Sequence, residues 1–427
     1  MMRFIYANGI DEYRFIDEMR LRAAEAGAEV NAAVAAILAD VRVNGIDAVQ
    51  KYSLQFDKSE AYEISKKTID AAYDRIDANL RDALIESAEN IRIYHEKMLQ
   101  ASWELNKGDG RIVGQRIRGL SRVGIYVPGG TAAYPSSVLM NAVPARVAGV
   151  EEIIMVTPPG KFLSDAVLAA AKIANVDRVI AVGGVQAIAA LSYGAGFIPR
   201  VDKIVGPGNA YVAAAKRQVF GTVDIDMVAG PSEVLVIADK TADVSYVAAV
   251  LRSQAEHDKL ASAILVTNDE DFAYHVTVEI ERQMMQLSRR EIMRTSIDDF
   301  GAIIICPDLK TGCAIANEIA PEHLEIMTKE PRMWLPFIKN AGAVFLGAYT
   351  PEPLGDYMAG PSHVLPTSGS ARFFSPLSVD SFIKKMSVIE YTRDALLDTA
   401  EKIVTVANSE QLTAHANSIL VRMNDSK

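Results

Sequence analysis

The sequence is poor in cysteine, tryptophan and histidine. Two cysteines, Cys306 and Cys313, occur among 427 residues, and so few exclude a disulfide framework or a zinc site built from thiolates. We therefore expect a reducing, cytoplasmic setting, with both cysteines acting as small buried apolar residues. Six histidines serve the whole chain. Histidine is the commonest metal ligand and changes charge near neutral pH, so those beside carboxylates are candidates for catalysis, although each alone is more often structural.

Charge and hydropathy exclude further classes of protein. The net charge is −10 and the isoelectric point is about 5.3, so the chain has no basic surplus with which to bind nucleic acid. No apolar run approaches the roughly 20 residues that span a bilayer, and the first residues lack the apolar core of a signal peptide. We expect no membrane partner. The composition is ordinary for a globular protein of two or three domains.

Hydrophobic periodicity divides the chain into helical ends around an alternating centre. Residues 23–43 and 68–99 carry apolar side chains at helical spacing. From residue 111, short apolar runs alternate with alanine-rich helical stretches, which is typical of βαβ units and a parallel sheet. The alternation falls into two series, and two series predict two α/β domains with a cleft for a ligand. The tail over 393–423 is again predicted to be helical.

These patterns predict an α/β fold with two Rossmann-like domains and parallel sheets. A helical N-terminal arm would span 1–21, and a C-terminal helical segment would span 377–427. The first α/β domain would be discontinuous, made of 22–127 and 233–376, and the second would span 128–232.

Two glycine-containing turns follow predicted strands. One is Pro128-Gly129-Gly130, and the other is Gly206-Pro207-Gly208-Asn209. Glycine lets backbone approach a ligand, and amides that open a helix can hold a phosphate. The second turn lacks the third glycine of a dinucleotide fingerprint, because Tyr211 stands there. Either turn could equally be a plain tight connection.

Candidate metal ligands lie in three separate segments. Gln254 and His257 are three residues apart on a predicted helix and share a face, although glutamine is an unusual ligand. Asp356, in a loop rich in glycine and proline, adds a carboxylate suited to Zn²⁺. Glu410 and His415 are five apart on the predicted C-terminal helix, so they face loosely neighbouring directions and a solvated helix explains them as well.

Glu322 and His323 are the candidates for acid/base work. A carboxylate beside a histidine raises its basicity and suits a general base. Adjacent residues in a strand point to opposite faces, so a shared role requires a backbone that is not extended there. Ser232 lies between the two βαβ series, where it could bind a substrate or simply form a turn.

Taken in order, these segments resemble the histidinol dehydrogenase family. Each motif is weak alone, but the ordered series is specific and covers most of the chain from about residue 110 to the end. The segments that carry it are 123–130, 206–209, 229–233, 254–257, 321–324, 355–357, 363–367 and the pair Glu410 and His415.

The resemblance implies a homodimeric enzyme that needs zinc and oxidises L-histidinol to L-histidine with two NAD+, in the last steps of histidine biosynthesis. Glu322 and His323 would carry the acid/base chemistry. The implied zinc ligands are Gln254, His257, Asp356 and His415. The implied substrate contacts are Ser232, His323, Glu410 and the four zinc ligands, and the implied NAD contacts are Tyr126, Gln186 and Asn209.

The resemblance also assigns sides to the domains. The first domain would hold metal and substrate, and the second would hold NAD. Glu410 and His415, on the C-terminal segment, would complete the site of the partner subunit.

Two alternatives stay open. A related zinc and NAD dehydrogenase could oxidise another alcohol, such as sulfopropanediol, but a carboxylate at Glu410 suits a cationic amine better than a sulfonate. A non-catalytic protein on this fold would not need Glu322 and His323 beside a full set of zinc ligands. Ser362 departs from the asparagine that many family members carry before His363.

Overall fold

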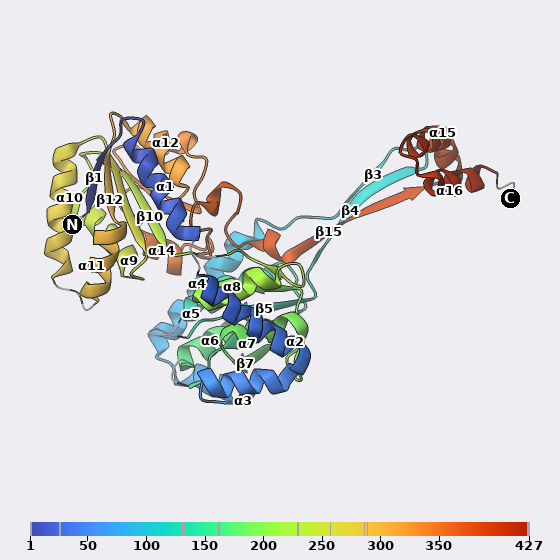
Figure 1. Ribbon diagram of the computed structural model, residues 1–427, viewed down its shortest axis with the longest axis horizontal. Coiled ribbons are helices and arrows are strands. Elements are labelled where there is room, and N and C mark those ends of the chain that lie inside the picture. The colour runs from blue at the N-terminus through green and yellow to red at the C-terminus, as the bar shows by residue number, and fades with distance from the viewer. Residues whose placement is uncertain are drawn as a thin grey trace. The chain divides into compact units, whose positions relative to one another are not determined.

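The computed structural model describes residues 2–24, 27–129, 134–160, 163–228, 230–256, 258–285, 287 and 289–424. The chain forms two compact units, one made of Met1–Met98 and Leu120–Phe382 and the other of Leu99–Gly119 and Ile383–Lys427. The first unit contains two six-stranded sheets (Figure 1). We name each sheet after its central strand, the β5 sheet and the β10 sheet.

The β5 sheet is parallel except at one edge. Its strands are β2 (Tyr62–Glu63), β5 (Arg122–Tyr126), β6 (Glu152–Thr157), β7 (Arg178–Ala181), β8 (Lys203–Val205) and β9 (Asp224–Ile225). They lie in the order β2-β7-β6-β5-β8-β9, and only β2 runs antiparallel. The chain therefore moves outward from β5 to β7 and then crosses to the other side of β5, which makes a switch point between β5 and β8.

Helices from two parts of the chain cover the β5 sheet. They are α2 (Ala28–Phe56), α3 (Lys66–Arg75), α4 (Ala78–Glu96), α5 (Pro135–Val147), α6 (Asp165–Ile173), α7 (Gly184–Tyr193) and α8 (Ala210–Val219). Helix α2 packs on α7 and α8, α3 packs on α6, and α4 packs on α5. Side chains at Ser65, Asp77, Ser164 and Asn209 cap four of these helices by accepting hydrogen bonds from first-turn amides.

The β10 sheet is parallel throughout. Its strands are β1 (Arg3–Tyr6), β10 (Glu233–Ala238), β11 (Ser262–Thr267), β12 (Ala302–Ile305), β13 (His323–Met327) and β14 (Ala343–Leu346). Their order is β1-β12-β11-β10-β13-β14, so a second switch point lies between β10 and β13. Every residue of β10, β11 and β13 is buried, as expected for a parallel sheet covered on both faces.

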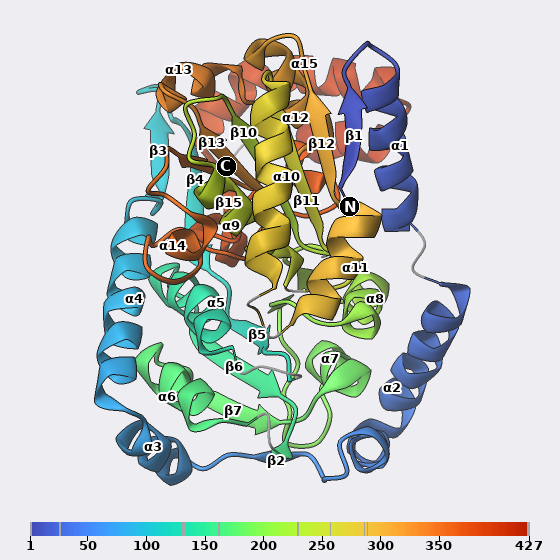
Figure 2. The same ribbon diagram turned by 90° about the vertical axis from the view of Figure 1, so that its left-hand side faces the viewer.

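Helices cover both faces of the β10 sheet. They are α1 (Asp11–Ala24), α9 (Val244–Ala255), α10 (Glu270–Met284), α11 (Arg290–Phe300), α12 (Leu309–Ile319), α13 (Pro331–Trp334) and α14 (Glu352–Tyr357). Side chains of α9, α10 and α11 share one hydrophobic cluster with the sheet, and those of α1 and α12 share another. Figure 2 shows α10 and α11 in front of the strands.

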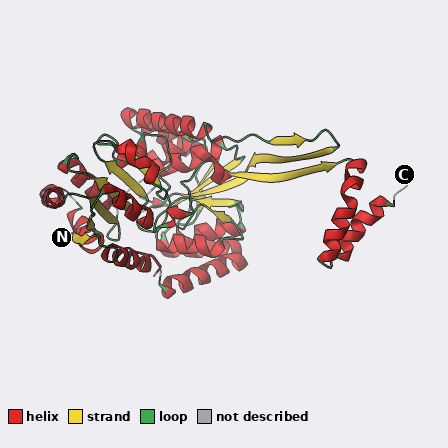
Figure 3. Ribbon diagram, turned by 90° about the horizontal axis from the view of Figure 1, so that it is seen from above, coloured by secondary structure: helices red, strands yellow, loops and turns green. Residues whose placement is uncertain are grey.

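The second unit is a three-stranded antiparallel ribbon with two helices (Figure 3). The ribbon consists of β3 (Trp103–Asn106), β4 (Arg111–Gly119) and β15 (Ile383–Tyr391), in the order β15-β4-β3. Helices α15 (Arg393–Ser409) and α16 (Thr413–Met423) pack on each other. Within the described residues, no helix combines the length and apolar character needed to cross a bilayer.

The predicted α/β class is confirmed, but the sheets do not follow the expected boundaries. Residues 1–21 are not a helical arm, because β1 is an edge strand of the β10 sheet and Phe15 and Ile16 of α1 are buried against that sheet. Strand β5 and helices α2–α4 belong with the β5 sheet rather than with 233–376. The segment 377–427 is not wholly helical, since it contains β15.

Candidate active site and dinucleotide site

Three residues meet at the amino ends of β10 and β13. Val234 pairs with His323 in the parallel register, so Glu233 and Glu322, which open or precede the strands, are neighbours. Glu322 Oε2 accepts a hydrogen bond from the Glu233 amide at 2.9 Å and lies 3.7 Å from His323 Nδ1. His323 Nδ1 also lies 3.2 Å from the Glu233 carbonyl oxygen, which fixes the orientation of the ring.

Glu322 and His323 can act together only if the backbone between them is not extended, and the structure meets this condition. Glu322 lies in a bend, and β13 begins only at His323. The carboxylate is therefore not forced to the face opposite the imidazole. Burial raises the pKa of Glu322 well above its usual value, and the carboxylates of Glu233, Glu352 and Asp356 raise it further.

Helix α14 supplies two more carboxylates. Glu352 and Asp356 are one turn apart and therefore share a face. Asp356 Oδ1 lies 3.9 Å from His323 Nε2, and ligand atoms of His323, Glu352 and Asp356 all lie within 4.8 Å of one another. Burial is the main reason why the pKa of Asp356 rises to about 7 and that of Glu352 to about 8.

Gln254, in the last turn of α9, joins this cluster. With its amide oriented to satisfy its neighbours, its nitrogen donates to the two Glu352 oxygens at 2.6 and 2.9 Å, and its oxygen accepts from the Glu233 amide at 2.9 Å. Ser253 Oγ donates to Glu352 Oε2 at 3.3 Å. His257, the other candidate on this helix, lies outside the described residues.

Glu325 contacts the start of α14, and it was not among the candidate residues predicted from the sequence. Its Oε1 accepts a hydrogen bond from the Glu352 amide at 2.8 Å, so it fixes the start of α14. Burial raises its pKa to about 8. The available signal was spacing, because Glu325 is two residues after His323 and shares its strand face. Glu352 was missed too, although it lies one turn before Asp356.

Serines near the cluster have defined positions. Ser232 is half-buried just before β10, and its carbonyl oxygen accepts from the Ser262 amide at 3.0 Å. Ser362 is buried, and its hydroxyl accepts from the Val364 amide at 3.1 Å. The same hydroxyl donates to the Met140 carbonyl oxygen at 3.5 Å, so Ser362 joins its loop to α5. Its neighbour His363 has Nδ1 3.2 Å from the Asp356 carbonyl oxygen.

The residues expected to contact NAD lie around the β5–β8 switch point. Tyr126 ends β5, and its hydroxyl accepts from the Gly184 amide at 3.1 Å. Burial raises its pKa to about 12. Gln186 is fully buried in α7 and donates to Asp57 Oδ2 at 3.4 Å. Asn209 caps α8 through the amides of residues 211 and 212.

The chain is similar to known proteins over nearly its whole length. The family model described as histidinol dehydrogenase matches residues 20–423. The chain is 51% identical over 426 residues to histidinol dehydrogenase of Clostridium acetobutylicum, covering 99% of each chain. The chain belongs to the histidinol dehydrogenase family. It is also 51% identical over 406 residues to the Bacillus subtilis histidinol dehydrogenase, covering 94% of this chain and 95% of that one.

A crystal structure of histidinol dehydrogenase from Elizabethkingia anophelis shares the fold. Its TM-score is 0.92 at 34% sequence identity, with 99% of this chain and 98% of that chain covered. Histidinol dehydrogenases are oxidoreductases of histidine biosynthesis that use NAD and Zn²⁺. The activity and the cofactors expected from the sequence are therefore confirmed.

The donor set at the β10 sheet fits a divalent cation of the kind that histidinol dehydrogenases use. Glu322, Glu352 and Asp356 surround one imidazole, and the Glu233 carboxylate is buried beside Glu322. The pKa values of all four are raised mainly because burial disfavours charge. In the described part of the chain, none of these four carboxylates forms an ion pair with a lysine or arginine. A bound metal ion would supply the missing positive charge, and nitrogen and oxygen donors are those that Zn²⁺ accepts.

Glu410 and His415 belong to the second unit. Glu410 is the C-cap of α15, and His415 lies in the first turn of α16. The sequence predicted that the two lie on one helix, and this prediction is wrong. Gln411, between them, adopts a left-handed conformation with φ 60°, which ends the first helix. Both side chains are exposed on this chain.

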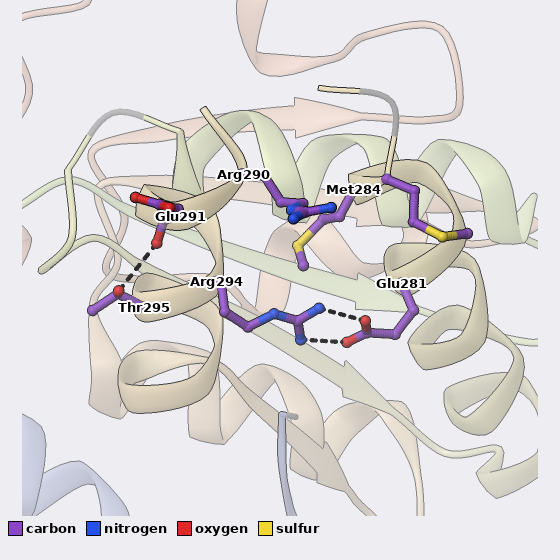
Figure 4. Close-up of a pocket in the computed structure, with 7 residues that line it drawn as sticks. Glu281, Met284, Arg290, Glu291, Arg294 and Thr295 are labelled. Carbon is purple, nitrogen blue, oxygen red and sulfur yellow. Dashed lines mark hydrogen bonds and ion pairs between the residues drawn. The ribbon is translucent and has the colours of Figure 1, made fainter. Parts of the chain in front are cut away.

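The surface hollow between α10 and α11 is a separate feature (Figure 4). Arg294 donates to both oxygens of Glu281 there, at 2.6 and 2.5 Å. The lining residues are Glu281, Met284, Met285, Arg290, Glu291, Arg294 and Thr295. None of them belongs to the cluster around His323, so the hollow is not the catalytic site.

Proposed function

We propose that this histidinol dehydrogenase oxidises L-histidinol to L-histidine through L-histidinaldehyde, in two hydride transfers to NAD+. The observation that carries the proposal is the buried pair of Glu322 and His323 inside a set of carboxylates that suits Zn²⁺. A binding protein would not need a base there, whereas alcohol oxidation must remove one proton for each hydride.

The proposed zinc ligands are Gln254, His257 and Asp356, with His415 contributed by the partner subunit. When bound, zinc supplies a positive charge that orients the amino and imidazole nitrogens of the substrate. Two of the three ligands from one chain, Gln254 and Asp356, both border Glu352 in the described structure. Metal analysis of His257→Ala, which should bind zinc weakly, tests the residue that lies outside the described part.

His323 is the proposed base for both oxidations. It takes the proton of the substrate hydroxyl, while hydride passes to NAD+ from the carbon that bears this hydroxyl. As water adds to the aldehyde, Glu322 takes a proton from the water, and His323 returns its own proton to the aldehyde oxygen, which frees the imidazole for the second oxidation. The resulting hydrate then gives a second hydride to NAD+ and a second proton to His323, which leaves the carboxylic acid. Bound aldehyde is protected from side reactions throughout.

Further proposed contacts complete the assignment. Ser232 would hydrogen-bond the substrate, together with His323 and the zinc ligands, and Glu410 of the partner subunit would face its cationic amine. Tyr126, Gln186 and Asn209 would contact NAD. Their support is the switch point between β5 and β8, where open α/β sheets bind nucleotides.

The assembly we propose is a homodimer with shared sites. Mixing His323→Ala with His415→Ala protein should give heterodimers with one intact site, because each variant keeps the group that the other lacks. We expect activity to return in isolated heterodimers, while each parent stays inactive. Heterodimers with no activity would contradict the sharing.

A reducing, cytoplasmic setting is also proposed. Both cysteines are free and buried, so no disulfide bond between them stabilises the fold. Fractionation of cells that express the protein, with activity followed in each fraction, tests this.

The decisive experiment counts NADH formed per L-histidinol consumed, before and after chelation. Two NADH per substrate, lost with a chelator and recovered with zinc, is the expected result. No turnover by zinc-loaded protein would contradict the proposed substrate.

A further inference from the structure

The turn between β8 and α8 is held by a buried ion pair. Lys216, on α8, and Asp226, just after β9, have side chains only 3% and 1% exposed and form a close ion pair. Lys216 Nζ also donates to the Gly206 carbonyl oxygen at 2.9 Å, and the Gly206 amide donates to Asp226 Oδ2 at 2.8 Å. One ion pair therefore binds both backbone polar groups of the first residue of the turn.

Gly206 has little freedom of its own. Its φ of +106° is a conformation that other residues rarely adopt, and a Cβ there would lie 2.2 Å from the Tyr126 carbonyl oxygen. The turn thus presses against the end of β5 at the switch point. At its other end, Asn209 is fixed by capping α8. The turn is anchored at both ends, to three elements at the carboxyl edge of one sheet.

Stability alone does not account for such a pair. Removing two charges from water costs as much as their attraction returns, and apolar residues of similar volume often stabilise a protein equally well. The particular contribution of Lys216 and Asp226 is geometric, because an apolar pair cannot bind an amide and a carbonyl oxygen at once. The backbone they fix lies where a dinucleotide approaches an α/β sheet.

We propose that Lys216 and Asp226 are positioning residues for NAD+, which hold the turn 206–209 in the conformation that receives the dinucleotide. This inference rests on the proposed function, which places NAD beside Tyr126 and Asn209. Neither charged group needs to touch the cofactor. Their effect passes through the backbone of Gly206.

The double variant Lys216→Met/Asp226→Leu separates positioning from stability. Removing both charges leaves no unpaired buried charge, but the Gly206 amide and carbonyl oxygen lose these partners, so we expect a folded protein with a moderately lower melting temperature. The KM for NAD+ and the Kd for NADH should rise about tenfold. The KM for histidinol and the kcat at saturating NAD+ should change less than twofold, since neither residue lies in the cluster around His323.

A control ion pair lies at the starts of β8 and β9. Lys203 at the start of β8 pairs with Asp224 at the start of β9 at 2.8 Å, at the opposite edge from the turn. Lys203→Met/Asp224→Asn should leave the KM for NAD+ unchanged. An equal rise in both double variants would overturn the proposal, because it would show a general loosening of the sheet.

A wild-type KM for NAD+ in the folded Lys216→Met/Asp226→Leu protein also overturns the proposal. If that protein does not fold, Asp226→Asn replaces it, because the amide keeps the shape but cannot accept all the hydrogen bonds. An unchanged Kd for NADH in Asp226→Asn is then the contrary result. Failure of the proposed function looks different, since the unaltered protein itself would not bind NADH.

Discussion

The two six-stranded sheets have the same strand order, but the functional groups that we propose lie at opposite edges. In the β5 sheet, Tyr126 and the turn 206–209 lie at the carboxyl ends of β5 and β8. In the β10 sheet, Glu233, Glu322 and His323 lie at the amino ends of the two equivalent strands, β10 and β13. Shared topology therefore did not dictate a shared location for the site.

Helix polarity supports the ligand that we propose for each edge. A helix that follows a parallel strand begins at the carboxyl edge and ends at the amino edge. Its N-terminus carries partial positive charge and its C-terminus partial negative charge. The start of α8 at Asn209 therefore favours the pyrophosphate of a dinucleotide. The end of α9, where Gln254 lies, favours a cation.

The carboxyl edge of the β10 sheet is used for structure. Asp239, just after β10, accepts hydrogen bonds from the amides of Lys329 and Thr241 at 3.2 and 2.9 Å. It thereby ties β10 to the segment after β13 across the switch point. Asp239 therefore follows β10, the counterpart of β5, at the edge where the β5 sheet has Tyr126 and the turn 206–209.

The largest expected effect tests whether chemistry belongs to the amino edge of the β10 sheet. His323→Ala should lower kcat about 1000-fold, because general base catalysis contributes factors of this size. Steady-state kinetics and metal analysis of the same sample measure it, and zinc should remain bound. The exposed His275 provides the control, since His275→Ala should keep full activity. A His323→Ala enzyme with the original kcat would remove the base from this edge.

A second test compares the two edges of that sheet directly. Glu352→Ala should weaken zinc binding about 10- to 100-fold, because partners that orient metal ligands commonly contribute that much. Glu352 accepts two hydrogen bonds from Gln254, and without it the amide is free to turn. Competition with a chromogenic chelator measures the affinity. Asp239→Asn, at the other edge, should leave zinc affinity unchanged, and a comparable loss there would break the comparison.

The sequence predicts the buried centre of the fold well. The predicted alternation of short apolar strands with alanine-rich helices after residue 111 is observed, for example in β8 and α8. Fully buried parallel strands form continuous apolar runs, and the glycines, prolines and polar residues around them end each run clearly.

Elements stabilised by distant partners were harder to predict. Strand β1 is four residues long and pairs only with β12, about 300 residues away in the chain. Strand β15 is mostly exposed and has no apolar alternation to reveal it. Helix α14 is six residues long, too short for periodicity to show. Glu325 and Glu352 were missed for the same reason, because their burial depends on tertiary packing.

A third test concerns the carboxyl edge of the β5 sheet. Tyr126→Phe removes the hydroxyl that accepts from the Gly184 amide and should raise the Kd for NADH about tenfold, the effect of one lost buried hydrogen bond. Fluorescence titration measures it. Zinc content should not change, since Tyr126 and the carboxylate cluster lie on different sheets. A loss of zinc without a change in NADH binding would reverse the assignment of the two edges.

The smallest expected effect is a pH dependence that only the amino-edge cluster produces. Burial raises the pKa of Asp356 to about 7, and those of Glu233 and Glu352 to about 7 and 8, whereas unfolded carboxyls titrate near pH 4. Folding therefore favours the protonated forms. Metal-free protein should lose stability as pH rises from about 4 to 8.

Zinc should suppress this loss, because a bound cation stabilises the ionised carboxylates. Melting temperatures of chelated and zinc-loaded protein, measured at pH 5 and pH 8, test the point. The difference between the two forms should be larger at pH 8. Added NADH should raise the melting temperatures of both forms by a similar amount at pH 5 and at pH 8. The reason is that the described residues around Tyr126 include no comparable cluster of carboxylates. If zinc raised the melting temperature by as much at pH 5 as at pH 8, the ionised carboxylates of this cluster would not be the groups that zinc stabilises.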